Sequence, residues 1–107
     1  MNTISIATLA NPADRTEYYF RLGRVHEELA EYNKALANYR NAISHGKDRH
    51  EQFAARAALQ MGVIYERAGM TTNALSSYNQ CLDMPSHDFQ NSIDQLAKAG
   101  INRLEGE

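Results

Sequence analysis

Residues 19–42 read YFRLGRVHEELAEYNKALANYRNA, and residues 58–81 read ALQMGVIYERAGMTTNALSSYNQC. When the second stretch is laid on the first with an offset of 39 residues, five positions are identical and several others are conservative. Chance is a poor explanation for so many matches at one offset, so the chain is interpreted as an internal repeat. The identical pairs are Gly23/Gly62, Glu27/Glu66, Ala35/Ala74, Leu36/Leu75 and Tyr39/Tyr78. The conservative pairs are Leu22/Met61, Val25/Ile64 and Ile43/Leu82.

The repeated small residues predict a close contact between two helices in each half. A glycine or alanine on a helix surface lets a neighbouring helix approach closely, and a large side chain one turn away fills the remaining space. Glycine inside a helix costs about 1 kcal/mol relative to alanine, so its use twice at one position needs a packing reason. We expect Gly23 and Gly62 to lie where the first helix of each half meets the second, near Tyr39 and Tyr78.

This spacing resembles the tetratricopeptide repeat family, whose pattern is W-x2-L-G-x2-Y, then A-x3-F, then P. The resemblance covers about residues 16–88. It departs from the pattern at the tryptophan position, which holds Tyr19 and Ala58, and at His26, which stands at the tyrosine position. The repeat of 39 residues is also longer than the family's, which is about 34. The resemblance implies an all-α superhelix of helix–turn–helix repeats, with about five helices.

Capping residues and periodicity predict where these helices begin and end. We expect helices over about 12–29, 32–44, 49–68, 71–84 and 86–104, with residues 1–10 as a flexible arm ahead of a single domain over 11–107. Repeat one spans about 12–46, repeat two about 48–85, and a capping helix about 86–105. Gly100 follows Gly62 by 38 residues, so the fifth helix has the character of the first half of a third repeat. The boundary signals are Asn11-Pro12, Asp14 with Glu17, Gly46, Asp48 with Glu51, Gly69, Thr71 or Thr72 as a cap, and Pro85. The residues Lys47–Phe53 are interpreted as an added turn on the third helix.

Composition excludes several classes of function. The net charge of −2 gives no basic footprint for nucleic acid, and no apolar run is long enough to cross a membrane. We expect no signal peptide and a cytoplasmic location. Cys81 stands where repeat one has Ala42, so it is expected to be a buried structural thiol. His45 and His50 straddle a turn, and no phosphate-binding or hydrolase motif occurs, so we expect no metal, no cofactor and no catalytic residue.

The resemblance also implies a binding surface, because in that family the first helices of successive repeats line a concave face. Register places these residues there from repeat one: Glu17, Phe20, Arg21, Arg24, Glu27 and Glu28. Repeat two contributes Arg56, Leu59, Gln60, Val63, Glu66 and Arg67. Arginine and aromatic side chains among apolar ones are typical of binding hot spots, and an arginine fork suits a carboxylate. Family members that hold a terminal carboxylate use lysine and asparagine where this chain has Phe20 and Arg24, so that ligand class is not supported.

Two functions follow from different classes. The first is a module that binds a peptide or helix of a partner protein in the concave groove, without catalysis. The second is a structural role, either as the C-terminal end of a longer repeat array or as a self-associating helical module, with a homo-oligomer as its product. An enzyme has no support in the sequence beyond scattered polar residues.

Overall fold

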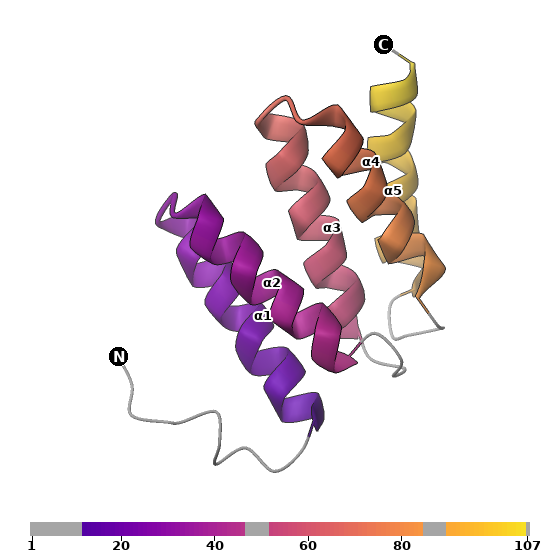
Figure 1. Cartoon of the computed structure of the whole chain (residues 1–107). Coiled ribbons are helices and arrows are strands. Elements are labelled where there is room, and N and C mark those ends of the chain that lie inside the picture. The colour runs from indigo at the N-terminus through magenta and orange to yellow at the C-terminus, as the bar shows by residue number, and fades with distance from the viewer. Residues whose placement is uncertain (1–11, 47–51, 85–89, 107) are drawn as a thin grey trace.

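The computed structural model describes residues 12–46, 52–84 and 90–106. Within these ranges the chain forms five α-helices and no strand, which confirms the predicted all-α repeat architecture (Figure 1). The helices are α1 (Pro12–Glu28), α2 (Tyr32–Gly46), α3 (Gln52–Arg67), α4 (Thr71–Asp83) and α5 (Gln90–Glu105). Several predicted features lie outside the described residues: the arm over residues 1–10, the Asp48–Glu51 capping box, most of the added turn, and Pro85.

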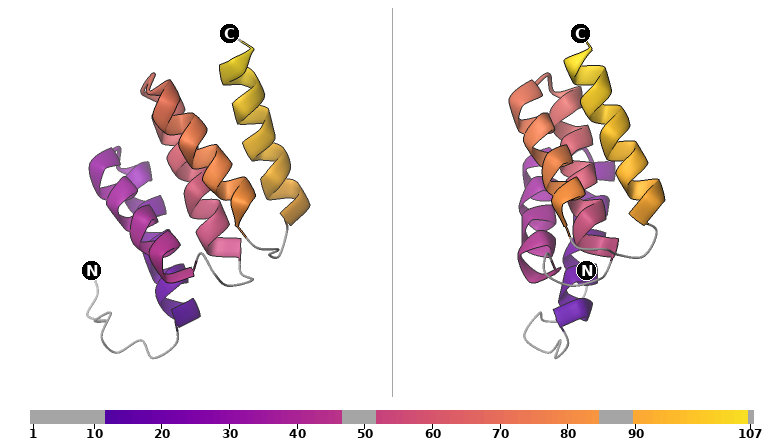
Figure 2. Two further views of the ribbon diagram at one scale, coloured as in Figure 1. Left: turned by 45° about the vertical axis from the view of Figure 1, so that its right-hand side comes forward. Right: turned by 90° about the vertical axis from the view of Figure 1, so that its right-hand side faces the viewer.

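The helices pack in the order expected for stacked hairpins. α1 pairs with α2 and α3 pairs with α4, while α2 contacts α3 and α4 contacts α5. α3 also contacts α1 and α5, so the first helices α1, α3 and α5 make one layer, with α2 and α4 behind it (Figure 2). α1 and α2 lie at one end of the stack and α5 at the other (Figure 1).

The repeated glycines lie where the sequence predicts, against the repeated tyrosines. A Cβ placed on Gly23 would overlap the ring of Tyr39, and a Cβ on Gly62 would lie 2.5 Å from Cε1 of Tyr78. Both rings are fully buried, so neither could move aside easily. Gly100 of α5 lies against the opposite edge of Tyr78, where an added Cβ would come within 2.5 Å of Cε2. Tyr78 is therefore held between two glycines, and α5 packs on α4 as the first helix of a further repeat would.

Each hairpin turns through the same backbone motif. Gly69 has φ +77° and Ala30, its counterpart in repeat one, has φ +62°. After α1 the Ala30 N–H donates to Glu27 O at 3.0 Å and the Glu31 N–H donates to His26 O at 2.8 Å. After α3 the equivalent bonds run from Gly69 to Glu66 and from Met70 to Tyr65. These are the two bonds of a Schellman motif, which satisfies carbonyls that the helix end leaves open.

Two predicted helix ends are wrong. Neither Thr71 nor Thr72 caps α4: the cap is Met70, which makes no side-chain bond, because the backbone of the preceding turn leads directly into the helix. Gly46 does not lie past the end of α2: it is part of the helix, as the last residue described before the gap at 47–51. A Cβ at Gly46 would come within 2.7 Å of Thr16 Cγ2 on α1 and 3.2 Å of Ala54 Cβ on α3. Glycine is therefore needed there so that α2 can approach both helices closely.

Candidate functional site

A cleft of about 270 Å³ opens on the layer formed by the first helices. α1 contributes Phe20 and Arg24, α3 contributes Arg56 and Gln60, and α5 contributes a third wall. Four of the residues predicted for the binding surface thus lie around one hollow, although they come from two repeats. We call this hollow the central cleft; its lining is Phe20, Arg24, Arg56, Gln60, Ser92, Ile93 and Leu96.

The α5 wall was not among the predicted site residues. In the sequence, Leu96 lies at helical spacing with the apolar residues Ile93, Ala97 and Gly100, as a packing residue would. The structure leaves Leu96 58% exposed, while Ile93 and Ala97 on the same helix are buried. The missed signal was the glycine spacing from Gly62 to Gly100, since a first helix of a third repeat would be expected to contribute to the same face.

The apolar floor of the central cleft belongs to the core. Phe20 is almost fully buried, with its ring 5.4 Å from the ring of Phe53 and 5.9 Å from that of Tyr39. Leu59, predicted to offer apolar contact, lies equally deep in the core and does not line the cleft. Because Phe20 is fixed by two neighbouring rings, the floor of the cleft is preformed.

Glu27 and Gln60 engage each other. The Tyr39 hydroxyl donates to Glu27 Oε1 at 2.7 Å, and Gln60 Nε2 donates to the same oxygen at 3.0 Å. Burial and the bond to Glu27 raise the pKa of Tyr39, so this hydroxyl stays protonated as a donor. Glu27 and Gln60 were predicted to face a partner, but Glu27 instead accepts hydrogen bonds from two side chains of its own chain and ties α1 to α2 and α3.

Repeat two contains the equivalent hydrogen bond between a tyrosine and a glutamate. The Tyr78 hydroxyl donates to Glu66 Oε1 at 2.7 Å, and Arg103 of α5 donates to both carboxylate oxygens, at 2.9 and 3.0 Å. Arg103 holds the pKa of Glu66 below its ordinary value, and burial raises the pKa of Tyr78 to about 12. The separation of 12 residues between glutamate and tyrosine in each repeat was visible in the sequence and could have indicated this bond.

The remaining predicted site residues lie away from the central cleft. Glu17 and Arg21 form an ion pair with each other along α1, with the Arg21 side chain 69% exposed. Val63 and Arg67 line a separate hollow of about 420 Å³ with Glu66 and Arg103. The predicted surface is thus divided into the central cleft and this shallower neighbour.

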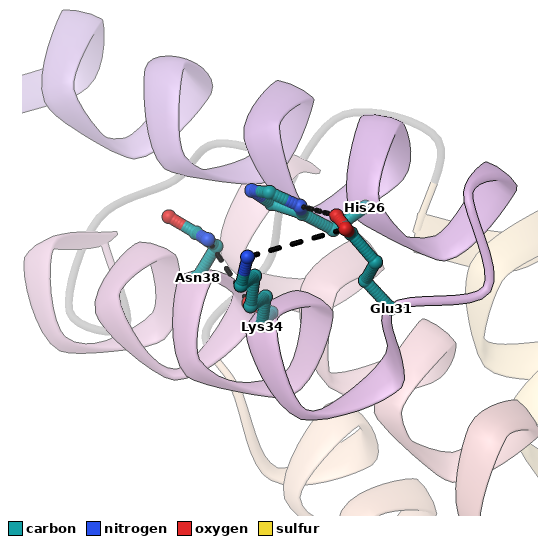
Figure 3. A network of polar contacts seen from close by, with 4 residues as sticks. All are labelled: His26, Glu31, Lys34 and Asn38. Atoms are coloured by element: carbon teal, nitrogen blue, oxygen red, sulfur yellow. Dashed lines mark hydrogen bonds and ion pairs between the residues drawn. The ribbon is translucent and has the colours of Figure 1, made fainter.

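The two histidines among the described residues have structural partners. His26 Nδ1 lies 2.7 Å from Glu31 Oε1, so the residue at the family's tyrosine position spans the α1–α2 turn, as Figure 3 shows. Lys34 lies 4.0 Å from the same carboxylate, and its backbone carbonyl accepts a bond from Asn38 (Figure 3). The hydrogen bond from His26 is the main reason that the pKa of Glu31 is lowered. His45 stacks on Tyr19, with centroids 5.3 Å apart. His50 lies outside the described residues.

Metal binding can be judged from the side chains in residues 12–46, 52–84 and 90–106. No three histidine, cysteine, aspartate or glutamate side chains gather there in a way that could hold a metal ion. Cys81 is free and fully buried, as predicted from its match with Ala42, and burial raises its thiol pKa to about 12. None of the helices seen in these ranges has both the length and the apolar character needed to cross a bilayer.

Comparison with known proteins agrees with the geometry. A family model described as the tetratricopeptide repeat matches residues 16–44 and residues 55–88, which are the two hairpins. No curated protein and no solved structure matches the chain significantly. The matched segments cover more than half of the sequence and coincide with α1–α2 and α3–α4, so the chain belongs to the tetratricopeptide repeat family.

Proposed function

We propose that this chain binds a peptide or helix of a partner protein in the central cleft, and that it does so without catalysis. Repeats of this family are non-catalytic and generally mediate protein–protein interaction. The observation that carries the proposal is the lining of the cleft, where an apolar floor and an exposed leucine lie beside two arginines.

The chemistry of the cleft favours a partner segment with an apolar side chain next to an acidic one. Phe20 and Ile93 are held by the core, so an apolar group inserted against them meets a surface that needs no rearrangement. A preformed surface reduces the entropy lost on binding. Arg24 of α1 and Arg56 of α3 both line the cleft with this floor, and a guanidinium suits a carboxylate.

The test is a double charge reversal at the rim of the cleft. Partners captured from the native host by the wild-type chain would be identified by mass spectrometry, and the strongest would be used for affinity measurements. We expect Arg24→Glu with Arg56→Glu to weaken binding by about 2–4 kcal/mol, because two hot-spot arginines are replaced by repelling charges. The circular dichroism spectrum should remain helical.

The matched control is Lys34→Glu with Lys98→Glu, which changes the net charge equally at exposed positions outside the cleft. This control should bind as the wild type does. If the Arg24/Arg56 variant captured the same partner with the same affinity, the assignment of the central cleft would be wrong.

A further inference from the structure

The outward face of α1 carries an apolar stripe that the described helices cover only in part. We call it the outer stripe of α1. It consists of Tyr18 and Leu22, which are partly buried, of Val25, and of Leu29, which directly follows the last residue of the helix. Val25 is 50% exposed and Leu29 63% exposed, although both are large aliphatic side chains. Helical periodicity places these residues about half a turn away from Phe20 and Glu27, which contact α3. The outer stripe of α1 thus faces away from the rest of the stack.

In repeat two, most of the equivalent residues on α3 are buried. The counterparts of Tyr18, Leu22 and Val25 at the offset of 39 residues are Ala57, Met61 and Ile64. Their exposed fractions are only 0%, 6% and 6%, and Ile64 lines one cleft with Tyr32 and Leu36 of α2. In α3 this face is therefore the surface on which the preceding helix packs. In α1 the same positions are apolar, but the described residues supply no preceding helix.

The spacing of the outer stripe fits a second helix. Its members follow one another at intervals of four, three and four residues, which is the spacing of a coiled-coil core. The stripe is also symmetric about its middle. In an antiparallel pair of α1 helices, Leu22 lies opposite Val25 of the other helix, and Tyr18 lies opposite Leu29. An α1 helix is therefore complementary to a second copy of itself.

The charges beside the stripe support the same pairing. Arg21 and Glu28 lie along one flank, at positions that face each other across an antiparallel pair. Arg21 of one copy would come within reach of Glu28 of the other, and the twofold axis would repeat the contact. Arg21 already pairs with Glu17 in its own helix, yet its side chain is 69% exposed and remains accessible to a second carboxylate.

At the opposite end of the stack, the described outward face of α5 is more polar, and its exposed Leu96 lines the central cleft instead. α5 turns Ile93, Ala97 and Gly100 toward its neighbours, which leaves Gln95, Ala99 and Asn102 on its outward face. This polar face would not bury the outer stripe of α1 in a head-to-tail contact. We propose that two copies of this chain associate through antiparallel packing of their α1 helices along the outer stripe.

The size of the contact determines its strength. The four residues of the outer stripe span about 16 Å of helix. A contact of that length buries less than the roughly 800 Å² per partner of a standard stable interface. We therefore expect a weak dimer that forms with rising concentration. Because both copies use the same surface, association closes at two and does not continue into longer assemblies.

Sedimentation equilibrium over a wide concentration range tests the proposal. The wild type should pass from monomer to dimer, and Leu29→Glu should raise the dimer dissociation constant by about tenfold or more. Leu96→Glu is the control, since Leu96 is similarly exposed but lies on α5. It should leave the dimer unchanged, while weakening any capture of a partner by the central cleft.

A charge exchange identifies the orientation. Arg21→Glu alone places two glutamates opposite each other in both symmetric contacts and should weaken the dimer. Arg21→Glu combined with Glu28→Arg restores opposite charges between copies and should recover dimerisation. Four outcomes would overturn the proposal. The wild type could remain monomeric at every concentration, or its dimer could be insensitive to Leu29→Glu. Assembly could continue beyond two copies, or the double variant could dimerise no better than Arg21→Glu.

Discussion

Ala30 holds a left-handed backbone conformation at the end of α1, with φ +62°. A side chain in this conformation costs about 1–2 kcal/mol, and glycine avoids that strain. Glycine also gains freedom in the unfolded chain, which offsets part of the benefit. We expect Ala30→Gly to raise the free energy of unfolding by about 0.5–1 kcal/mol, measured by urea denaturation. Gly69→Ala makes the reverse change at the equivalent turn and should destabilise; a loss of stability in Ala30→Gly would show that the turn is not strained.

Gly62 lies in contact with the ring of Tyr78, and this contact gives the second residue-scale prediction. In an exposed helix, glycine to alanine stabilises by about 0.5–1 kcal/mol. Here the new Cβ would lie 2.5 Å from a buried ring carbon, so Gly62→Ala should instead destabilise, by about 1–3 kcal/mol from overpacking. Thermal or urea unfolding measures the effect. A more stable Gly62→Ala protein would mean that α3 and α4 are not in tight contact at this point.

At the scale of elements, α5 is attached through a charged contact as well as through its apolar face. Arg103 pairs with Glu66 of α3 and keeps the pKa of that carboxyl below 4.5. Because the pKa is lower in the folded than in the unfolded chain, the stabilisation is complete above pH 4.5 and is lost as the pH falls through the folded value. Since Arg103 is more than half exposed, solvent screening limits the pair to about 1 kcal/mol or less.

The corresponding prediction compares wild type with Glu66→Gln, which keeps an acceptor for Tyr78 but removes the charge. We expect the wild type to be more stable at about pH 7 and the difference to shrink toward about pH 3, as the glutamate becomes protonated. Urea denaturation at both pH values gives the two free energies. A difference that is constant with pH would indicate that the Arg103–Glu66 pair does not contribute.

The helices themselves could be predicted from the sequence because their signals are local. The glycine–alanine–tyrosine spacing and the glycine after α3 gave the hairpins and their order. The errors concern contacts between distant residues. In the sequence Gly46 resembles the residue after a helix end, but its role is set by its contacts with Thr16 and Ala54. Leu96 resembles a core residue in the sequence, but in the structure it lines the central cleft. Three of the seven residues that line the central cleft were not predicted, and all three are on α5. Register identifies the exposed side of a helix, but it could not show that Gln60 donates to Glu27 there.

At the scale of the whole molecule, the stack need not open as one unit. Each repeat contacts only its neighbours, so the end nearest a disturbed interface should open first. Cys81 reports on the α4–α5 end, because it is fully buried and its pKa is raised to about 12. Labelling by a thiol reagent therefore requires opening of that end.

We predict that Gly100→Ala, which crowds Tyr78 from the α5 side, speeds labelling of Cys81 by about fivefold or more. Gly23→Ala crowds the equivalent tyrosine at the other end of the stack and should have a smaller effect. Labelling rates under native conditions measure both variants. Equal acceleration would show that the five helices open cooperatively.

Tyr78 has one more consequence for the molecule. Its two ring edges contact Gly62 on α3 and Gly100 on α5, so the width of a single aromatic ring sets the separation of these helices. The same two helices supply Arg56, Gln60, Ile93 and Leu96 to the central cleft. Tyr78 therefore acts as a buried spacer between these helices, and we infer that replacing it alone would change the width of the proposed binding cleft.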